Sequence, residues 1–316
     1  MKRDAEEPVI SRSPQAIEVS LVRAAEPFLG ALAQSAEWLE GGDEALVLRV
    51  VTDLGAVVLH ASPPWRTRKE LEWVHAVVRH AHTRVPEVVT PFERFGRTAF
   101  EWQGRLVAAF PFVAGEPFDR DDAVLRADAA RLLALIHTAL LDCPAGPRPE
   151  SRALNPVPPA DLADLNDPAL DAWWLAIRGQ GFIVAPTHGD YYRRNLLCEN
   201  RRIVGVIDWH DSSIRPAALE LAGATFELCR NDEHVLQFDR ADTFIELYRA
   251  AGGPVANREV EFLLPLIRLW IRNDVRSSLA HGGDVSDNYV AKQMRAFREL
   301  ASCEWRPRSD PRASAG

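Results

Sequence analysis

The chain has 316 residues, of which 47% are hydrophobic and 26% charged, so it can bury a sizeable core as one large or two modest domains. A formal net charge of −8 argues against nucleic acid as the main partner, because phosphate backbones are bound by Lys and Arg. Four scattered cysteines indicate no disulfide framework or zinc site. A charged N-terminus without a signal-peptide core, and no long apolar run, lead us to expect a cytoplasmic protein without a membrane partner.

The first third of the chain combines strand and helix patterns. Two apolar strands joined by a Thr-Asp-Leu-Gly turn predict a β-hairpin. Two glycines, Gly41 and Gly42, precede it and fit either a plain turn or a phosphate-covering loop. The expected helices are 14–32 and 68–81. The expected strand-like segments are 37–40, 45–51, 56–60, 92–102 and 106–113.

The rest of the chain is expected to be mainly helical. His137 and the pair Trp173-Trp174 lie on these helices and are interpreted as core side chains, because amphipathic helices must bury one face. A proline-rich loop spans 143–159, and a short strand spans 182–185. The expected helices are 121–141, 161–178, 216–230, 233–251, 257–281 and 285–305.

The most informative stretch is Thr187–Asp211, THGDYYRRNLLCENRRIVGVIDWHD. Asp190 is followed by four residues and then Asn195. A short strand and a turn lead into the β-branched run 202–207, and Asp208 follows at its end. A loop, a strand, a turn and a second strand would bring the three polar side chains to one rim. A β-hairpin with ordinary polar ends is the alternative interpretation.

Phosphoryl transfer requires such a set, because the protein mainly positions groups and neutralises charge. A carboxylate near the acceptor hydroxyl orients it and takes its proton, a role suited to Asp190. An amide oxygen and a second carboxylate hold Mg²⁺ against nucleotide phosphates, since hard cations prefer oxygen ligands. Asn195 and Asp208 suit that role.

The pattern H-G-D-x-x-x-x-N followed by I-D-W resembles the aminoglycoside phosphotransferase and choline kinase group, the small-molecule branch of the protein kinase-like fold. The resemblance covers roughly residues 41–300 and is specific at 187–211. It implies an α+β fold with two lobes. The expected parts are a sheet-bearing nucleotide-binding lobe at 1–113, a mainly helical lobe for catalysis and the acceptor at 114–305, and a mobile tail at 306–316.

The resemblance also implies residues that contact the nucleotide, and here the sequence departs from the family. The phosphate-gripping lysine at the end of the second hairpin strand is replaced by His60. If Val51 pairs with Ala56, Arg49 lies on the same face as His60 and is a second candidate. Glu72 corresponds to the helix glutamate that faces this position, and a solvated surface glutamate is an equal alternative.

The segment 106–117 resembles the linker whose backbone binds adenine. Because proline has no N–H, the carbonyl of Phe110 and the N–H of Phe112 or Val113 would serve. A buried or edge strand explains the apolarity of this segment equally well. In the helical half, Glu220 stands where the family has aspartate and is expected to brace the catalytic loop without being catalytic.

The sequence therefore predicts a kinase that moves the γ-phosphate of ATP (or GTP), with Mg²⁺, to a hydroxyl of a small molecule. Candidate acceptors are an aminoglycoside or other antibiotic, choline, homoserine or a sugar. A monomer or homodimer is expected. The alternative is a kinase-fold binding protein with weak or no turnover, because His60 replaces the lysine.

Overall fold

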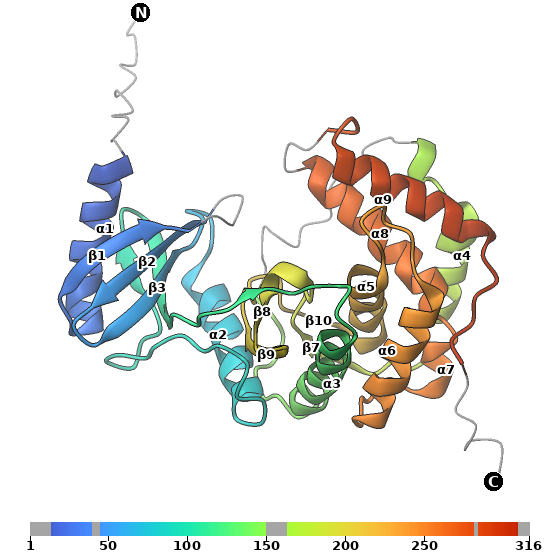
Figure 1. Ribbon diagram of the computed structural model, residues 1–316, viewed down its shortest axis with the longest axis horizontal. Coiled ribbons are helices and arrows are strands. Elements are labelled where there is room, and N and C mark those ends of the chain that lie inside the picture. Colours follow the sequence, from blue (N-terminus) through green and yellow to red (C-terminus); the bar gives the residue numbers. More distant parts are fainter. Residues whose placement is uncertain (1–13, 40–44, 150–162, 281–283, 309–316) are drawn as a thin grey trace, which may run out of the picture. The chain divides into compact units, whose positions relative to one another are not determined.

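The computed structural model describes residues 14–39, 45–149, 163–280 and 284–308 (Figure 1). The glycine pair at 41–42 lies outside these ranges, as do residues 150–159 of the proline-rich loop and residues 309–316 of the tail. A five-stranded antiparallel sheet is followed by a mainly helical region, which confirms the predicted α+β class. No helix in the described ranges is long and apolar enough to cross a membrane.

The first structural unit is a twisted sheet covered by one helix. Its strand order is β1-β2-β3-β5-β4, and all neighbours are antiparallel. Alternate residues of β2 and β3, including Leu48 and Leu59, are buried with Leu21 of the helix, as the period of two requires. The elements are α1 (Pro14–Leu29), β1 (Ala33–Trp38), β2 (Leu46–Thr52), β3 (Gly55–Ala61), β4 (Phe100–Trp102) and β5 (Arg105–Pro111).

The hairpin register agrees with the sequence prediction. Val51 pairs with Ala56 and Arg49 with Val58, while His60 pairs with Val47 on one side and Ala108 on the other. The buried side chains of β3 are those of odd number, so His60 lies on the opposite face of the sheet, with Arg49.

Helix α2 (Arg68–His82) belongs by its contacts to the second unit. Residues up to Arg68 group with Thr90–Phe112, whereas Lys69–Val89 group with the chain from Val113 onward. Trp73, Val74 and Val77 of α2 are accordingly buried in the core of the helical unit. The domain limits drawn from the sequence, 1–113, 114–305 and 306–316, remain predictions.

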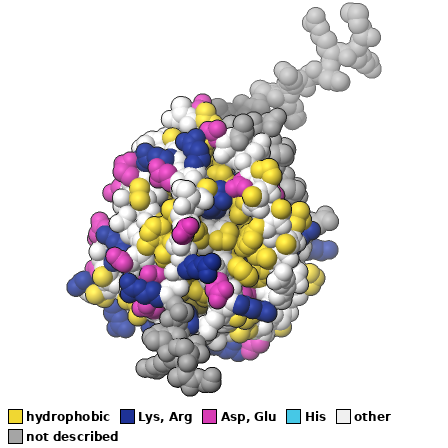
Figure 2. All heavy atoms as spheres, turned by 90° about the vertical axis from the view of Figure 1, so that its right-hand side faces the viewer, with side chains coloured by type: hydrophobic (Ala, Val, Ile, Leu, Met, Phe, Trp, Pro, Cys, Tyr) yellow, Lys and Arg dark blue, Asp and Glu magenta, His cyan; other side chains and the backbone are white. Residues whose placement is uncertain are grey.

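The second unit is built from helices with two small sheets between them. The strands β6 (Glu116–Pro117), β8 (Leu196–Glu199) and β9 (Arg202–Val206) form one sheet, and β7 (Val184–Thr187) pairs with β10 (Ser213–Pro216). The longer helices are α3 (Ala123–Leu140), α4 (Pro168–Ile177), α5 (Ala217–Cys229), α6 (Phe238–Ala250), α8 (Leu263–Ala280) and α9 (Asn288–Glu299), and a single turn, α7 (Asn257–Val260), precedes α8. On the face drawn in Figure 2, basic and acidic side chains are interspersed, and the visible acidic side chains do not form a single patch.

Several predicted helix limits were wrong because local capping overrides periodicity. Residues 161 and 162 of the helix expected at 161–178 lie outside the described ranges, and from residue 163 onward the α-helix begins only at Pro168, where the Asp167 carboxylate caps the N–H of Leu170. The helix expected from 233 begins at Phe238, because the Asn231 side chain accepts hydrogen bonds from the N–H groups of Glu233 and Val235 and folds a loop there. Strand β10 was not predicted.

Candidate active site

The three polar residues of the motif do converge in the second unit. Asn195 closes a single 3₁₀ turn, Arg193–Asn195, that leads into β8, and Asp208 follows β9. Asn200 and Arg201 both have positive φ, and together they form the tight turn that folds β9 back on β8. The N–H of Ile207 donates to the carbonyl of Asn195 at 3.0 Å, so the residue before Asp208 is fixed to Asn195.

Asn195 contacts Asp190 directly. Its Nδ2 donates to the Asp190 backbone carbonyl at 2.9 Å and to the carboxylate Oδ2 at 3.0 Å. Asn195 is buried at 4% exposure, so this geometry is held by packing. Since both N–H bonds of the amide are used on Asp190, the amide oxygen remains as the group that can accept a cation.

Asp208 is exposed and has φ of +59°, a left-handed conformation that is uncommon outside glycine. Such conformations cost free energy and concentrate at functional sites, where the surrounding structure holds them. Asp208 is also close enough to Asp190 for its charge to raise the pKa of the Asp190 carboxyl.

The Asp190 carboxyl lies among other carboxylates. Burial raises its pKa well above the ordinary range, and the charges of Asp211, Asp208, Asp274 and Glu227 raise it further. Burial and negative neighbours both disfavour the ionised form. A cation beside Asp208 would remove part of this repulsion and allow Asp190 to act as an ionised base.

His188 holds the loop that carries Asp190, and both of its ring nitrogens are used in hydrogen bonds to the backbone. Its Nδ1 accepts from the N–H of Asp190 at 3.2 Å, so Nε2 donates to the carbonyl of Ile207 at 2.9 Å. Burial lowers its pKa, which keeps the ring neutral in this arrangement. One imidazole thus connects the loop that carries Asp190 to the segment that carries Asp208.

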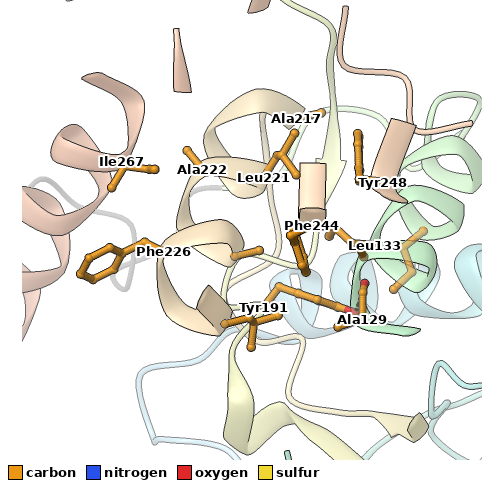
Figure 3. Close-up of a cluster of buried hydrophobic side chains, with 14 of the residues drawn as sticks. Ala129, Leu133, Tyr191, Ala217, Leu221, Ala222, Phe226, Phe244, Tyr248 and Ile267 are labelled. Carbon is orange, nitrogen blue, oxygen red and sulfur yellow. Dashed lines mark hydrogen bonds between the residues drawn. The ribbon is translucent and has the colours of Figure 1, made fainter. Parts of the chain in front are cut away.

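Gly189 and Tyr191, the two neighbours of Asp190, are both held in place by other segments of the second unit. Gly189 has φ of +97°, and a Cβ there would lie 2.1 Å from the carbonyl oxygen of Asp211, so a larger residue would displace the loop. The Tyr191 hydroxyl donates to the carbonyl of Ala129 on α3 at 3.0 Å (Figure 3). The residue after Asp190 is therefore anchored in the helical core.

Glu220 on α5 braces the catalytic loop from the other side. Its carboxylate accepts from the backbone N–H of His188 at 3.1 Å and of Gly189 at 2.5 Å. Burial opposes its ionisation, but the hydrogen bond and charge of His137, with smaller contributions from His188 and the Gly189 N–H, lower the pKa of Glu220 to about 2. It is therefore a carboxylate at neutral pH.

The predicted nucleotide contacts divide between the two units. Arg49 and His60 lie in the first unit, whereas Glu72 lies in the second with Asp190, Asn195 and Asp208. The guanidinium of Arg49 pairs with Glu37 of β1 at 2.5 Å and stacks on the ring of Phe112 at 4.3 Å. A phosphate at Arg49 would therefore compete with an existing carboxylate partner.

Two glutamates of α2 differ sharply in environment. Glu72 is exposed, whereas Glu70 is only 1% exposed and lies 3.3 Å from the guanidinium of Arg148. Arg148 also donates to the carbonyl of His210, two residues beyond Asp208. Sequence reasoning missed Glu70, although its spacing of three and four from the buried Trp73 and Val74 places it on the buried face.

One of the backbone groups predicted to bind adenine already has a hydrogen-bond partner in the sheet. The N–H of Phe112 donates to the carbonyl of Ala56 at 3.1 Å and so extends the pairing of β5 with β3. Phe110 lies within β5, opposite Val58. Of the two predicted donors, Val113 is the one that this sheet bond leaves available for a base.

The ligand chemistry of the site fits a hard divalent cation. Across the described ranges, the structure contains no group of three or more His, Cys, Asp or Glu side chains that could hold a metal by themselves. Asn195 and Asp208 offer one amide and one carboxylate oxygen. Mg²⁺ is commonly held by one or two carboxylates together with substrate phosphates and waters, so two oxygen ligands fit a cation that arrives with a nucleotide.

Comparison with solved structures finds proteins of the same fold. The structure is similar to the amicoumacin kinase hAmiN in complex with AMP-PNP, Ca²⁺ and Ami (TM-score 0.70, 11% identity, 96% of this chain and 100% of that one). It is also similar to the macrolide 2′-phosphotransferase MphH from Brachybacterium faecium (0.57, 19%, 93% and 100%) and the choline kinase LicA from Streptococcus pneumoniae (0.61, 16%, 91% and 100%). These likenesses confirm the kinase-like fold.

The family follows from the sequence itself. Residues 35–263 match the model of the phosphotransferase enzyme family, APH, and the chain belongs to that family. No curated protein sequence matches the chain. The predicted resemblance is thereby confirmed, and with it the prediction of a small-molecule phosphotransferase.

Proposed function

We propose that this phosphotransferase moves the γ-phosphate of ATP (or GTP) to a hydroxyl group of a small molecule. The observation that supports the proposal is the contact of Asn195 with Asp190 near Asp208, because it would place a base and two oxygen ligands together within the second unit. The mainly positional and electrostatic demands of phosphoryl transfer suit this set.

In this proposal Asp190 orients the acceptor hydroxyl and takes its proton. Asn195 and Asp208 hold Mg²⁺, which supplies positive charge to the nucleotide phosphates. The hydrogen bonds from Asn195 fix the Asp190 carboxylate, so the base is positioned before the acceptor arrives. His188, Glu220 and Tyr191 keep the loop backbone in place.

For the nucleotide, His60 or Arg49 contacts the phosphates, with Glu72 as the partner carried on α2. Phe110 C=O and Val113 N–H are the proposed adenine contacts, and Phe112 contributes its ring beside Arg49. The buried Glu70 is an alternative to Glu72 for the helix glutamate, because it is already ion-paired in the core of the second unit.

The acceptor is a small molecule with a free hydroxyl. Aminoglycosides and other antibiotics, choline, homoserine and sugars are the classes to test. We further propose that the protein is cytoplasmic and acts as a monomer or homodimer.

A phosphorylation screen tests the proposal. The protein, Mg²⁺ and γ-labelled ATP or GTP are incubated with each acceptor class, and transfer of label is measured against the folded Asp190→Asn variant. Label transfer that requires Asp190 supports the proposal. Tight nucleotide binding without transfer or hydrolysis would instead favour a kinase-fold binding protein, the alternative raised by His60 at the lysine position.

A further inference from the structure

Two buried side chains, far from the motif in sequence, form a hydrogen-bonded chain that ends on Glu220. His137 on α3 places Nε2 2.8 Å from Glu220 Oε2, and Tyr248 on α6 places its hydroxyl 2.8 Å from His137 Nδ1. Their exposures are 1% for His137, 5% for Glu220 and 0% for Tyr248. Sequence reasoning assigned His137 to core packing, and its burial agrees with that. Its hydrogen bonds to Glu220 and Tyr248 could not be predicted from periodicity.

We propose that Tyr248 and His137 are positioning residues that act through Glu220 to hold the backbone immediately before Asp190. The proposal rests on the proposed function, in which Asp190 is the base. Glu220 accepts hydrogen bonds from the N–H groups of His188 and Gly189, the two residues that precede Asp190. The chain thus connects helices α3, α5 and α6 to the base.

The charge of Glu220 fixes the direction of its hydrogen bond with His137. Glu220 is ionised and has no proton to donate, so His137 must donate from Nε2. The other ring nitrogen, Nδ1, lies 2.8 Å from the Tyr248 hydroxyl and forms the second hydrogen bond of the chain. Burial raises the pKa of Tyr248, so the phenol keeps its proton at neutral pH. Removing the His137 imidazole or the Tyr248 hydroxyl leaves a buried polar group without one hydrogen-bond partner, which costs free energy where no water can replace it.

The opposite side of the same loop is also held. The Ser212 hydroxyl donates to the His188 carbonyl at 3.2 Å, and the backbone of Gly189 lies against the Asp211 carbonyl. The loop is therefore fixed between the segment after Asp208 on one side and Glu220 on the other. If Glu220 loses its support, the loop can move while the rest of the core stays packed.

Two substitutions of His137 separate positioning from packing. His137→Leu keeps an apolar side chain of moderate size but removes the donor to Glu220. His137→Gln restores an N–H donor at about the place of Nε2. Thr138→Val is the matched control, because the Thr138 hydroxyl joins the same α3 to the Gly252 carbonyl after α6 at 3.1 Å without contacting Glu220. Tyr248→Phe is a second test that keeps the aromatic ring.

Hydrogen exchange is the first readout and needs no activity. We expect amide exchange at His188 and Gly189 to rise about tenfold or more in His137→Leu, to return toward wild type in His137→Gln, and to be unchanged in Thr138→Val. The second readout is turnover with ATP and an acceptor. In His137→Leu, kcat should fall about 10- to 100-fold, the effect of one charge-assisted hydrogen bond, with the KM for nucleotide within about twofold. Tyr248→Phe should show the same pattern to a smaller extent.

The outcomes separate this inference from the proposed function. If wild type transfers no phosphate but His137→Leu still speeds exchange at the loop, the proposed function fails and the positioning chain stands. If wild type turns over and a folded His137→Leu or Tyr248→Phe changes neither exchange nor kcat, the chain is refuted. It is also refuted if His137→Gln gives no rescue, or if Thr138→Val lowers kcat as much as His137→Leu.

Discussion

Asp274→Asn should stabilise the protein at neutral pH and have little effect near pH 4. Asp274 lies on α8 and accepts hydrogen bonds from the Tyr289 hydroxyl at 2.9 Å and from Gln293 Nε2 at 3.0 Å. Burial, with the charge of Glu227, raises its pKa from 3.8 to about 6. An asparagine oxygen can accept the same two hydrogen bonds, so the substitution removes the charge and keeps the contacts.

The magnitude follows from linkage. Below pH 3.8 the carboxyl is protonated in both the folded and the unfolded chain, so it contributes no pH-dependent stability. Between about pH 4 and pH 6 the unfolded chain loses its proton while the folded protein keeps it, and the folded state becomes less favoured. Above pH 6 the cost is constant. A rise in pKa from 3.8 to about 6 corresponds to about 3 kcal/mol, at 1.36 kcal/mol for each pH unit.

Urea denaturation of wild type and Asp274→Asn at pH 4, 5, 6, 7 and 8 measures this directly. The difference in unfolding free energy should increase between pH 4 and 6 and then stay level. Asp284→Asn is a control of opposite sign, because hydrogen bonds from the Ser286 N–H and hydroxyl lower the pKa of the exposed Asp284. A difference between wild type and Asp274→Asn that is the same at every pH would refute the argument.

Three further predictions concern the site. Asp208→Ala should abolish Mg²⁺-dependent turnover with the fold intact by circular dichroism, and full activity in the folded variant would contradict its role as a ligand. Asp190→Asn should slow transfer about 10²- to 10⁴-fold while nucleotide affinity by calorimetry stays close to wild type, because a general base acts on the chemical step; weakened nucleotide binding with unaltered turnover would reverse that assignment. His60→Ala should weaken nucleotide binding by about 1–3 kcal/mol, because it loses a charge-assisted contact with phosphate. His60→Lys should preserve the affinity, because it keeps that contact. If the affinity of His60→Ala is unchanged, Arg49 is the next residue to test.

The sequence by itself determined the features that depend on near neighbours. The spacing from Asp190 to Asn195 and the hairpin that leads to Asp208 are local, so the three residues could be placed together before the fold was known. The α+β order and the pairing of Arg49 with Val58 follow in the same way, because strand periodicity and a four-residue turn fix the register.

Tertiary structure decided the contacts between segments far apart in the chain. Glu220 meets His137 across 83 residues and His188 across 32, and Tyr248 meets His137 across 111. Hydrophobic periodicity tells which face of a helix is buried, but it does not tell which polar group lies opposite a buried histidine. For the same reason the sequence did not single out Glu70, which pairs with Arg148, and did not show that the Phe112 N–H bonds within the sheet. Hydrogen-bond partners are set by packing and not by local pattern.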